Sequence, residues 1–217
     1  MDPIAIAARL EPFARLSQEQ LVQTSIYLDL LLKWNARINL TAVRTPEEIV
    51  TRHFGESFFM ASRLLPGTEA TSVIDLGSGA GFPGLPLAMF APSASVMLIE
   101  SNTKKTVFLN EVVAALKLKN VVVLRQRGED CSQRSRLVTM RAVEDFQRAL
   151  AVASRLAEPG GRIALMIGAG QVALAKSITP EVVWAEPVPV PKSLTRVLLV
   201  SSSLRIVETK PTADPRG

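Results

Sequence analysis

The sequence predicts an α/β protein with a mostly parallel sheet, an antiparallel pair of strands near its carboxyl end and a helical extension at its amino end. Three observations support this fold class. From residue 72 onward, apolar strand-like segments alternate with helical segments, and repeated strand–helix units form parallel sheets with helices on both faces. Two late extended segments, residues 182–185 and 197–201, are separated by prolines and by no helix, so they can pair as a hairpin. The first 70 residues show helical periodicity.

The 217 residues suffice for one large core, and the hydrophobic fraction of 47% is ordinary for a globular protein. We expect a helical extension over residues 1–70, a sheet domain over residues 71–209 and a flexible tail over residues 210–217. No apolar run approaches the roughly 20 residues that a membrane helix needs. Cys131 is the only cysteine, which excludes an intrachain disulfide and suits a cytoplasmic protein.

Helix-start signals mark two helices of the extension. Ser17 with Gln20 three residues later is a possible capping box. Thr45 can cap a later helix that has proline at its first position and Glu48 within reach of the cap. That helix would carry His53, the only histidine of the chain.

The sheet domain is predicted from its apolar segments and turns. Strands are expected at residues 72–76, 96–100, 121–124, 137–140 and 163–167, with a turn at 159–161. Helices are expected at residues 104–116 and 145–157. In the first of these, the inward-facing candidates are Val107, Leu109 and Val112.

A glycine-rich loop follows the first expected strand. The strand end carries Asp75, and glycines stand at Gly77, Gly79 and Gly81. Glycine lets the backbone turn sharply and approach a ligand closely. In such α/β sheets, ligands bind outside the carboxyl ends of the strands. Asp75 would suit a cationic ligand that carries a sulfonium and an amino-acid group.

The loop fits two ligand classes. The spacing from Gly77 is typical of methyltransferases, whereas Gly79, Gly81 and Gly84 also match the dinucleotide fingerprint. In a dinucleotide fold the first glycine directly follows the strand, and a glycine would then be needed where Phe82 stands. We therefore rank a methyl donor ahead of a dinucleotide, and both ahead of a turn without a ligand. The fold is then a Rossmann-like class I methyltransferase.

Two further positions indicate an adenosine group. Glu100 ends the second expected strand, where a carboxylate can accept hydrogen bonds from both ribose hydroxyls. After the third strand, the segment 127–130 offers a backbone amide and a carboxylate to an adenine ring. Because NAD and S-adenosylmethionine share adenosine, these positions do not separate the two ligands.

The absence of two motifs narrows the choice of atom that receives the methyl group. Methylation of an exocyclic adenine amine usually requires an Asn/Asp-Pro-Pro-aromatic loop, and the corresponding place here reads Met140-Arg141-Ala142-Val143. Pyrimidine carbon methylation needs a nucleophilic cysteine, and Cys131 stands in an arginine-rich loop before the fourth strand. A ring nitrogen with a lone pair, such as guanine N7, needs no general base. No catalytic residue is identified with certainty.

The chain resembles the RsmG (GidB) family over roughly residues 25–200. The resemblance is carried by Trp34-Asn35, Asn39-Leu40-Thr41, Arg52-His53, Glu56-Ser57, the segment 75–84 and Phe108-Leu109. Members of that family methylate N7 of guanine in bacterial small-subunit ribosomal RNA. The resemblance implies that Gly77, Phe82, Gly128, Glu129 and Arg141 line the donor site, to which the residue analysis adds Gly79 and Glu100.

Arg141, Arg196 and His53 are candidates for positioning the reactants, although His53 could equally be a packing residue. We interpret the Asn39-Leu40-Thr41 segment as a structural turn. The chain departs from the family pattern at Met140, Glu56 and Ile167-Gly168, where the family usually has Ser, Asp and Lys-Gly.

The charge distribution indicates a polyanionic partner or a solubilising surface. Net charge is +5, and residues 101–217 contain 18 basic and 10 acidic side chains. Candidates for RNA contact are Arg125, Arg127, Arg134, Arg136, Lys192 and Arg196.

We therefore expect S-adenosyl-L-methionine-dependent methylation of guanine N7 in small-subunit (16S) ribosomal RNA. The expected enzyme is a cytoplasmic monomer without a metal, acting on the RNA or on the assembled subunit. The alternatives are a small-molecule methyltransferase and a donor-binding RNA module without turnover.

Overall fold

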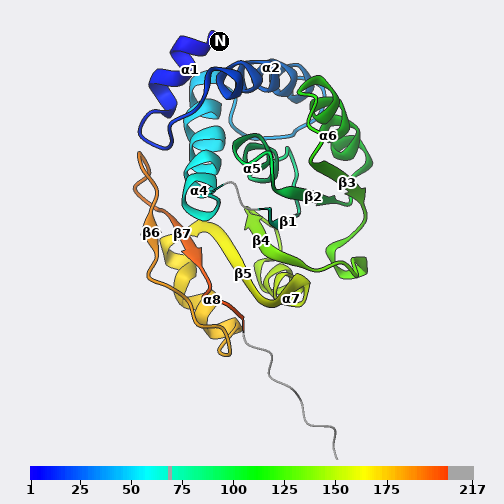
Figure 1. Ribbon diagram of the computed structural model, residues 1–217, viewed down its shortest axis with the longest axis vertical. Helices are drawn as coiled ribbons and strands as arrows, with labels where there is room; N and C mark the ends of the chain where they lie inside the picture. Colours follow the sequence, from blue (N-terminus) through cyan, green and yellow to red (C-terminus); the bar gives the residue numbers. More distant parts are fainter. Residues whose placement is uncertain (68–69, 205–217) are drawn as a thin grey trace, which may run out of the picture.

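The computed structural model describes residues 1–67 and 70–204, and its centre is a seven-stranded sheet in the order β3-β2-β1-β4-β5-β7-β6 (Figure 1). The parallel strands are β1 (Ser72–Leu76), β2 (Ser95–Glu100), β3 (Val121–Arg125), β4 (Ser135–Arg141) and β5 (Ala157–Gly168). The antiparallel strands are β6 (Val188–Pro189) and β7 (Arg196–Val200). The predicted Rossmann-like fold with a terminal antiparallel pair is confirmed.

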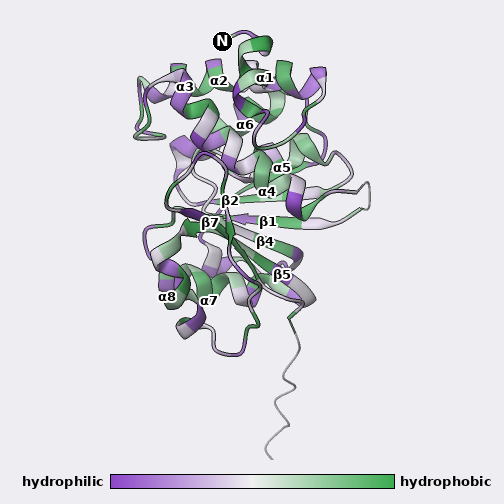
Figure 2. Ribbon diagram, turned by 90° about the vertical axis from the view of Figure 1, so that its left-hand side faces the viewer, coloured by the Kyte–Doolittle hydropathy of each residue, from purple (hydrophilic) through white to green (hydrophobic). Residues whose placement is uncertain are grey.

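Helices cover both faces of the sheet (Figure 2). One face carries α1 (Pro3–Leu10), α2 (Gln18–Asn35), α4 (Glu56–Leu64), α5 (Gly84–Phe90) and α6 (Thr103–Ala115), and the other carries α7 (Phe146–Leu156) and α8 (Val172–Ile178). Alternate side chains along a strand pack into the apolar cores on opposite faces of the sheet. In β1, Val73 packs with the first group of helices and Ile74 with the second.

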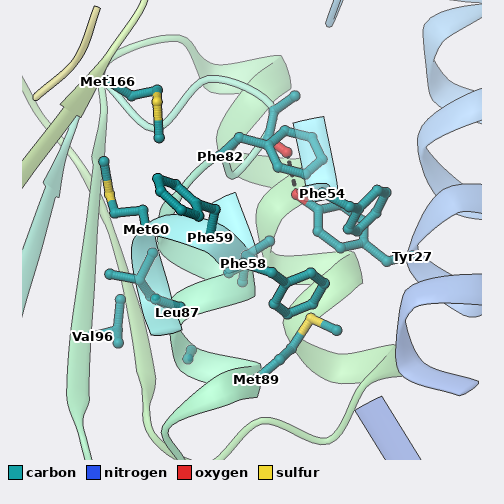
Figure 3. Packing of buried hydrophobic residues seen from close by; sticks show 14 of the residues in the cluster. Tyr27, Phe54, Phe58, Phe59, Met60, Phe82, Leu87, Met89, Val96 and Met166 are labelled. Atoms are coloured by element: carbon teal, nitrogen blue, oxygen red, sulfur yellow. Dashed lines mark hydrogen bonds between the residues drawn. The ribbon is translucent and has the colours of Figure 1, made fainter. Parts of the chain in front are cut away.

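The amino-terminal helices share a core with the sheet domain. Tyr27 of α2 stacks on Phe82 of the glycine-rich loop, with ring centroids 5.2 Å apart, and both meet Phe54 edge-on (Figure 3). The Tyr27 hydroxyl donates to the carbonyl of Ala80. A boundary at residue 70 stays a prediction, and the extension is continuous with the core that supports the loop.

Both predicted capping signals are confirmed. Ser17 and Gln20 exchange side-chain–backbone hydrogen bonds of 2.8 and 3.2 Å at the start of α2. The Thr45 hydroxyl accepts from the Glu48 amide at the start of α3 (Pro46–Glu48). α3 continues into η1, a π-helical segment over Ile49–Gly55 that carries His53.

One local expectation is wrong, and two are confirmed only in part. Residues 182–185 form no strand, but Trp184 makes an antiparallel bridge to Ser201 and the Ala185 amide donates to the Val200 carbonyl; β7 itself pairs with β5 and with the later β6. Val107 is exposed, because the buried stripe of α6 runs through Phe108, Leu109 and Val112. The expected turn at 159–161 lies within β5, as an irregularity in its pairing with β4 where Gly160 has a φ of +77°. The predicted tail 210–217, and residues 205–209 of the predicted domain, lie outside the described residues. Within the described ranges, no helix is both long and apolar enough to cross a membrane.

Candidate active site

Two adjoining cavities open at the carboxyl ends of β1, β2 and β4. The larger encloses about 620 Å³ and the smaller about 230 Å³. Residues of the glycine loop, the end of β2 and the segment after β4 line both cavities, namely Gly77, Glu100, Ser101, Val143 and Glu144. The two spaces together form the ligand-binding crevice expected at this edge of the sheet.

The glycine loop forms one wall of the larger cavity. Gly77 and Gly79 have φ of +70° and +57°, a region that side chains with a Cβ rarely adopt. The amides of Gly77 and Ser78 both donate to the Ile99 carbonyl at 3.0 Å, which ties the loop to β2. Phe82, at the end of this loop, is buried and packs in the aromatic cluster with Tyr27 and Phe54. The predicted donor residues Gly77, Gly79 and Phe82 are thus brought together.

Asp75 has a different place from the one expected. Its side chain is buried and lines neither cavity among the described residues. Its Oδ1 accepts from the Thr139 hydroxyl at 2.9 Å and its Oδ2 from the Gly84 amide at 3.1 Å, and burial raises its pKa to about 6. The expectation that Asp75 faces a cationic ligand is therefore wrong: this carboxyl joins β1 to β4 and to the start of α5.

Glu100 borders both cavities, as its position at the end of β2 predicts. Its Oε2 accepts from the Gly79 amide at 2.9 Å and its Oε1 from the Asn102 amide at 2.7 Å. These bonds fix the carboxylate, and each oxygen retains a lone pair for a further donor. The geometry is compatible with a ribose whose two hydroxyls point at this side chain.

The smaller cavity has both apolar and polar lining residues. Leu76, Ile99 and Val152 supply apolar surface, and Gly128 and Glu129 line it as well. A Cβ on Gly128 would overlap Leu76, so glycine is needed for close packing there. Glu129 forms an ion pair with Arg148.

A chain of side chains runs along the other end of the larger cavity. The Arg141 guanidinium lies 2.7 Å from Nδ1 of His53, 3.3 Å from the Arg52 carbonyl and 3.2 Å from Oε2 of Glu56. On the far side of the imidazole, Nε2 lies 2.6 Å from the Thr41 hydroxyl. Burial, followed by the charges of Arg141, Arg52 and Arg196, lowers the pKa of His53 to about 3. The imidazole is therefore neutral at physiological pH.

The sequence did not identify Thr41 or Asn35 as residues of the site. Oδ1 of Asn35 accepts from the amides of Leu40 and Thr41 at 2.9 and 3.0 Å. These bonds hold residues 40 and 41 in a turn at the end of α2. The turn also brings Thr41 to the wall of the larger cavity, next to His53. No signal in the sequence shows that these two residues meet.

A separate basic cleft of about 350 Å³ lies beside the larger cavity. Arg52, Lys192 and Arg196 line it, together with Glu56. Of the other predicted RNA contacts, Arg127 lines the smaller cavity and Arg125 ends β3.

Arg134 and Arg136 flank the beginning of β4, at the opposite edge of the sheet from the cavities. Arg136 is paired there with Glu158 at 3.5 Å. Their contact with RNA stays a prediction that the geometry does not favour.

Two of the three departures from the family pattern fall in the apolar core. Met140 and Ile167 are buried in the cluster beneath α7 and α8, and neither lines a cavity among the described residues. Glu56 keeps a carboxylate beside Arg141, as an aspartate would.

Comparison with known proteins identifies the family. The profile described as "GidB: rRNA small subunit methyltransferase G" matches residues 20–179. The chain belongs to this family. It is 38% identical to ribosomal RNA small subunit methyltransferase G of Roseiflexus castenholzii, over 94% of this chain and 90% of that protein. The Myxococcus xanthus protein of the same name is 40% identical over 65% of this chain and 66% of its own length.

Solved structures support the fold. The chain is similar to magnesium protoporphyrin IX methyltransferase from Synechocystis, solved with bound S-adenosylmethionine, with a TM-score of 0.64, 14% identity and coverage of 88% of this chain and 99% of that chain. It is also similar to a ribosomal protein L11 methylase from Lactobacillus delbrueckii, with a TM-score of 0.61, 11% identity and coverage of 70% and 79%. The chain is an S-adenosyl-L-methionine-dependent methyltransferase of ribosomal RNA.

Proposed function

We propose that this enzyme methylates N7 of one guanine in 16S ribosomal RNA, with the donor in the paired cavities and the guanine at the Thr41 end of the larger one. The observation that carries the proposal is the continuity of the two cavities past Glu100 and Gly77. Such a crevice holds an elongated ligand with a nucleoside at one end. Its other end leaves room for an acceptor base beside the methyl group.

The residues present fit S-adenosyl-L-methionine. The apolar surface of Leu76, Ile99 and Val152 in the smaller cavity suits the adenine ring, and Gly128 and Glu129 line the same cavity. Glu100 would accept from the ribose hydroxyls. The methionine part would then pass Gly77 and Gly79 toward Phe82 and Arg141, as the family resemblance implies. When bound, the donor supplies an electrophilic methyl group on a sulfonium.

No free general base is found among Thr41, His53 and Arg141, the described residues at the acceptor end, whereas Glu144 lines both cavities and therefore lies where they meet. His53 is neutral, but its Nδ1 already accepts from Arg141. Glu56 is paired with Arg141 and is not among the residues that line the larger cavity. A guanine N7 lone pair attacks the methyl carbon while the carbon–sulfur bond breaks, and no proton has to leave. The chain then acts by holding the two reactants in line.

The basic cleft favours an RNA partner over a small molecule. Arg52, Lys192 and Arg196 stand beside one carboxylate, Glu56, so the cleft carries excess positive charge. We propose that it holds backbone phosphates next to the methylated guanine. The remaining alternative is a donor-binding RNA module without turnover, which would follow if the lysine that the family usually has at position 167 were needed for methyl transfer; Ile167 packs in the core here.

Three further points belong to the proposal. We propose a monomer that acts in the cytoplasm, where bacterial ribosomal RNA is found. The substrate is the RNA or the small subunit that contains it. We also retain the division into a helical extension and a donor-binding domain at about residue 70.

Single-turnover methylation tests the proposal. Purified enzyme, donor and unmethylated small-subunit RNA should yield 7-methylguanosine after digestion to nucleosides. The chemical rate should be nearly constant across neutral pH, because no deprotonation is required. A rate that rises tenfold per pH unit, or a methyl group on an exocyclic amine or a hydroxyl, would refute N7 as the acceptor. Transfer to small nucleophiles without RNA would favour the small-molecule alternative.

A further inference from the structure

The Thr41 hydroxyl occupies a defined place at the acceptor end of the larger cavity. It lines the cavity together with Gly79, Phe82 and Arg141. Its oxygen lies 2.6 Å from Nε2 of His53, and it accepts from the Val43 amide at 3.1 Å. The backbone of this turn is held by Asn35. The hydroxyl is therefore fixed through both its side chain and its backbone.

The direction of each hydrogen bond in the chain follows from Arg141. A guanidinium only donates, so the imidazole nitrogen 2.7 Å from Arg141 must accept. A neutral imidazole then carries its proton on the other nitrogen, which faces Thr41. A flipped ring would turn Cδ2 and Cε1 toward Arg141 and Thr41, so the two close contacts fix the ring orientation as well as the position of the proton. His53 thus donates to Thr41.

This arrangement makes Thr41 a donor toward the cavity. A hydroxyl has two acceptor positions and one proton. His53 and the Val43 amide fill the acceptor positions, so the proton is the only remaining capacity of the group. No hydrogen bond from this proton to an acceptor is found among the described residues.

We propose that the Thr41 hydroxyl donates a hydrogen bond to O6 of the guanine being methylated, and that His53 is the positioning residue that fixes the direction of this bond. The inference rests on the proposed function. Guanine presents N7 and O6 as adjacent acceptors on one edge, whereas adenine presents an amino group beside N7. A hydroxyl fixed as a donor can form a hydrogen bond with O6 of guanine. It cannot form one with the amino group of adenine, which is also a donor.

The bond serves base selection and not acceleration of methyl transfer. A hydrogen bond to O6 withdraws electron density from the purine ring, which does not help N7 to attack. Its effect should therefore appear in the affinity for RNA that carries guanine at the target position. One neutral hydrogen bond contributes about 1 kcal/mol, which corresponds to about a fivefold change in Kd.

The test compares guanine with 2-aminopurine at the methylated position. 2-Aminopurine keeps N7 and lacks O6. Small-subunit RNA with either base is titrated with enzyme saturated with the demethylated donor. Wild-type enzyme should bind guanine RNA about fivefold more tightly, and Thr41→Val should bind the two RNAs equally. Thr24→Val, which also loses one hydroxyl hydrogen bond but lies in α2, should keep the wild-type preference.

A second pair of variants tests the role of His53. His53→Phe should lose the base preference, as Thr41→Val does. His53→Gln should restore part of it, because an amide can accept from Arg141 and donate to Thr41. A residue with only a structural role would weaken the binding of both RNAs equally.

The outcomes separate this inference from the proposed function. Equal affinity of wild-type enzyme for the two RNAs overturns the inference, even if no variant folds. The inference is also overturned if Thr41→Val weakens the affinity for both RNAs by the same factor. A weaker affinity of Thr41→Val for the donor would show that the hydroxyl contacts the donor instead. If wild-type enzyme forms no 7-methylguanosine from guanine RNA, the proposed function itself has failed.

Discussion

Arg141 connects the donor cavity, the acceptor end and the basic cleft. One of its terminal nitrogens lies within 3.3 Å of His53, the Arg52 carbonyl and Glu56, and its Nε has no hydrogen-bond partner among the described residues. Nε is sealed from the cavity, but Arg141 lines the larger cavity, and its other terminal nitrogen, which has no hydrogen-bond partner among the described residues, is suited to an anionic group of a ligand. The donor carboxylate is such a group, so Arg141 could hold both the ligand and the chain that ends at Thr41.

Replacing Arg141 by lysine should show that its shape matters beyond its charge. A lysine ammonium cannot meet His53, Glu56 and a ligand in the planar arrangement of a guanidinium. We expect Arg141→Lys to lower the methylation rate by about 10- to 100-fold, which corresponds to the loss of one or two charged hydrogen bonds. Arg134→Lys, on the exposed opposite edge, is the matched control. Equal activity of the two variants in a methyl-transfer assay would show that the arginine shape is dispensable.

His53 should make stability depend on pH in a predictable direction. Its pKa is about 3 in the folded protein and 6.5 in a model peptide, so the unfolded chain binds the proton more tightly. Stability is therefore lost as pH falls from 6.5 toward 3. Because the ring is partly exposed, the loss between pH 7 and pH 5 should be at most about 2 kcal/mol.

Urea denaturation of wild type and His53→Gln at the two pH values isolates this contribution. Asp75, whose pKa is raised to about 6, contributes in the opposite direction, because the folded protein gains a proton as pH falls through 6. It is present in both proteins, so its effect cancels in the difference. A difference that does not change between pH 7 and pH 5 would contradict the account of a buried neutral imidazole.

The sequence predicted much of the donor site and little of the acceptor end. Gly77, Glu100 and Gly128 stand at the carboxyl ends of β1, β2 and β3, and a parallel sheet brings these ends to one edge. The Thr41–His53–Arg141 chain has no such signal. Its members are 12 and 88 residues apart, and no local pattern reports which of them meet.

At the level of the elements, the turn from β1 into α5 sets the shape of the donor cavity. Gly81 has a φ of +88°, and a Cβ there would overlap the Tyr27 hydroxyl and Leu85. The loop is therefore packed against α2 without space for one additional carbon. The helical extension thus acts on the donor site through the backbone of this loop.

Gly81→Ala should destabilise the protein more than Gly160→Ala does. Gly160 has a similar φ of +77° with no atom within 4 Å of a built Cβ, so it measures the backbone strain alone. We expect about 1–2 kcal/mol for Gly160→Ala and about 1–3 kcal/mol in addition for Gly81→Ala because of overpacking. Denaturation curves give both values. Similar costs would mean that the loop can move away from Tyr27.

The elements that the sequence misplaced depend on tertiary pairing. β6 is a two-residue edge strand that includes Pro189, and its pairing with β7 defines it. Residues 182–185 have a more strand-like composition, yet they make only the Trp184–Ser201 bridge and its adjoining hydrogen bonds at the end of β7. Edge strands tolerate proline, so composition alone cannot locate them.

Across the whole molecule, some basic side chains lie next to the cavities and others lie far from them. Arg52, Lys192 and Arg196 adjoin the acceptor end, whereas Arg134 and Arg136 lie at the far edge of the sheet. If the cleft holds RNA phosphates, Lys192→Ala should reduce the slope of log affinity against log salt by about 1. Arg134→Ala should leave the slope unchanged. The opposite ranking, measured by RNA titration at several salt concentrations, would move the RNA to the far edge.

The most direct test of the account is mass mapping of small-subunit ribosomal RNA from cells with and without this protein. The account predicts that one guanine carries a methyl group at N7 when the protein is present and none when it is absent. It also predicts that Arg141→Lys leaves that guanine largely unmethylated, whereas Arg134→Lys restores full methylation. RNA with the same methylation pattern in both kinds of cell would contradict the central claim, as would a lost methyl group at any atom other than a guanine N7.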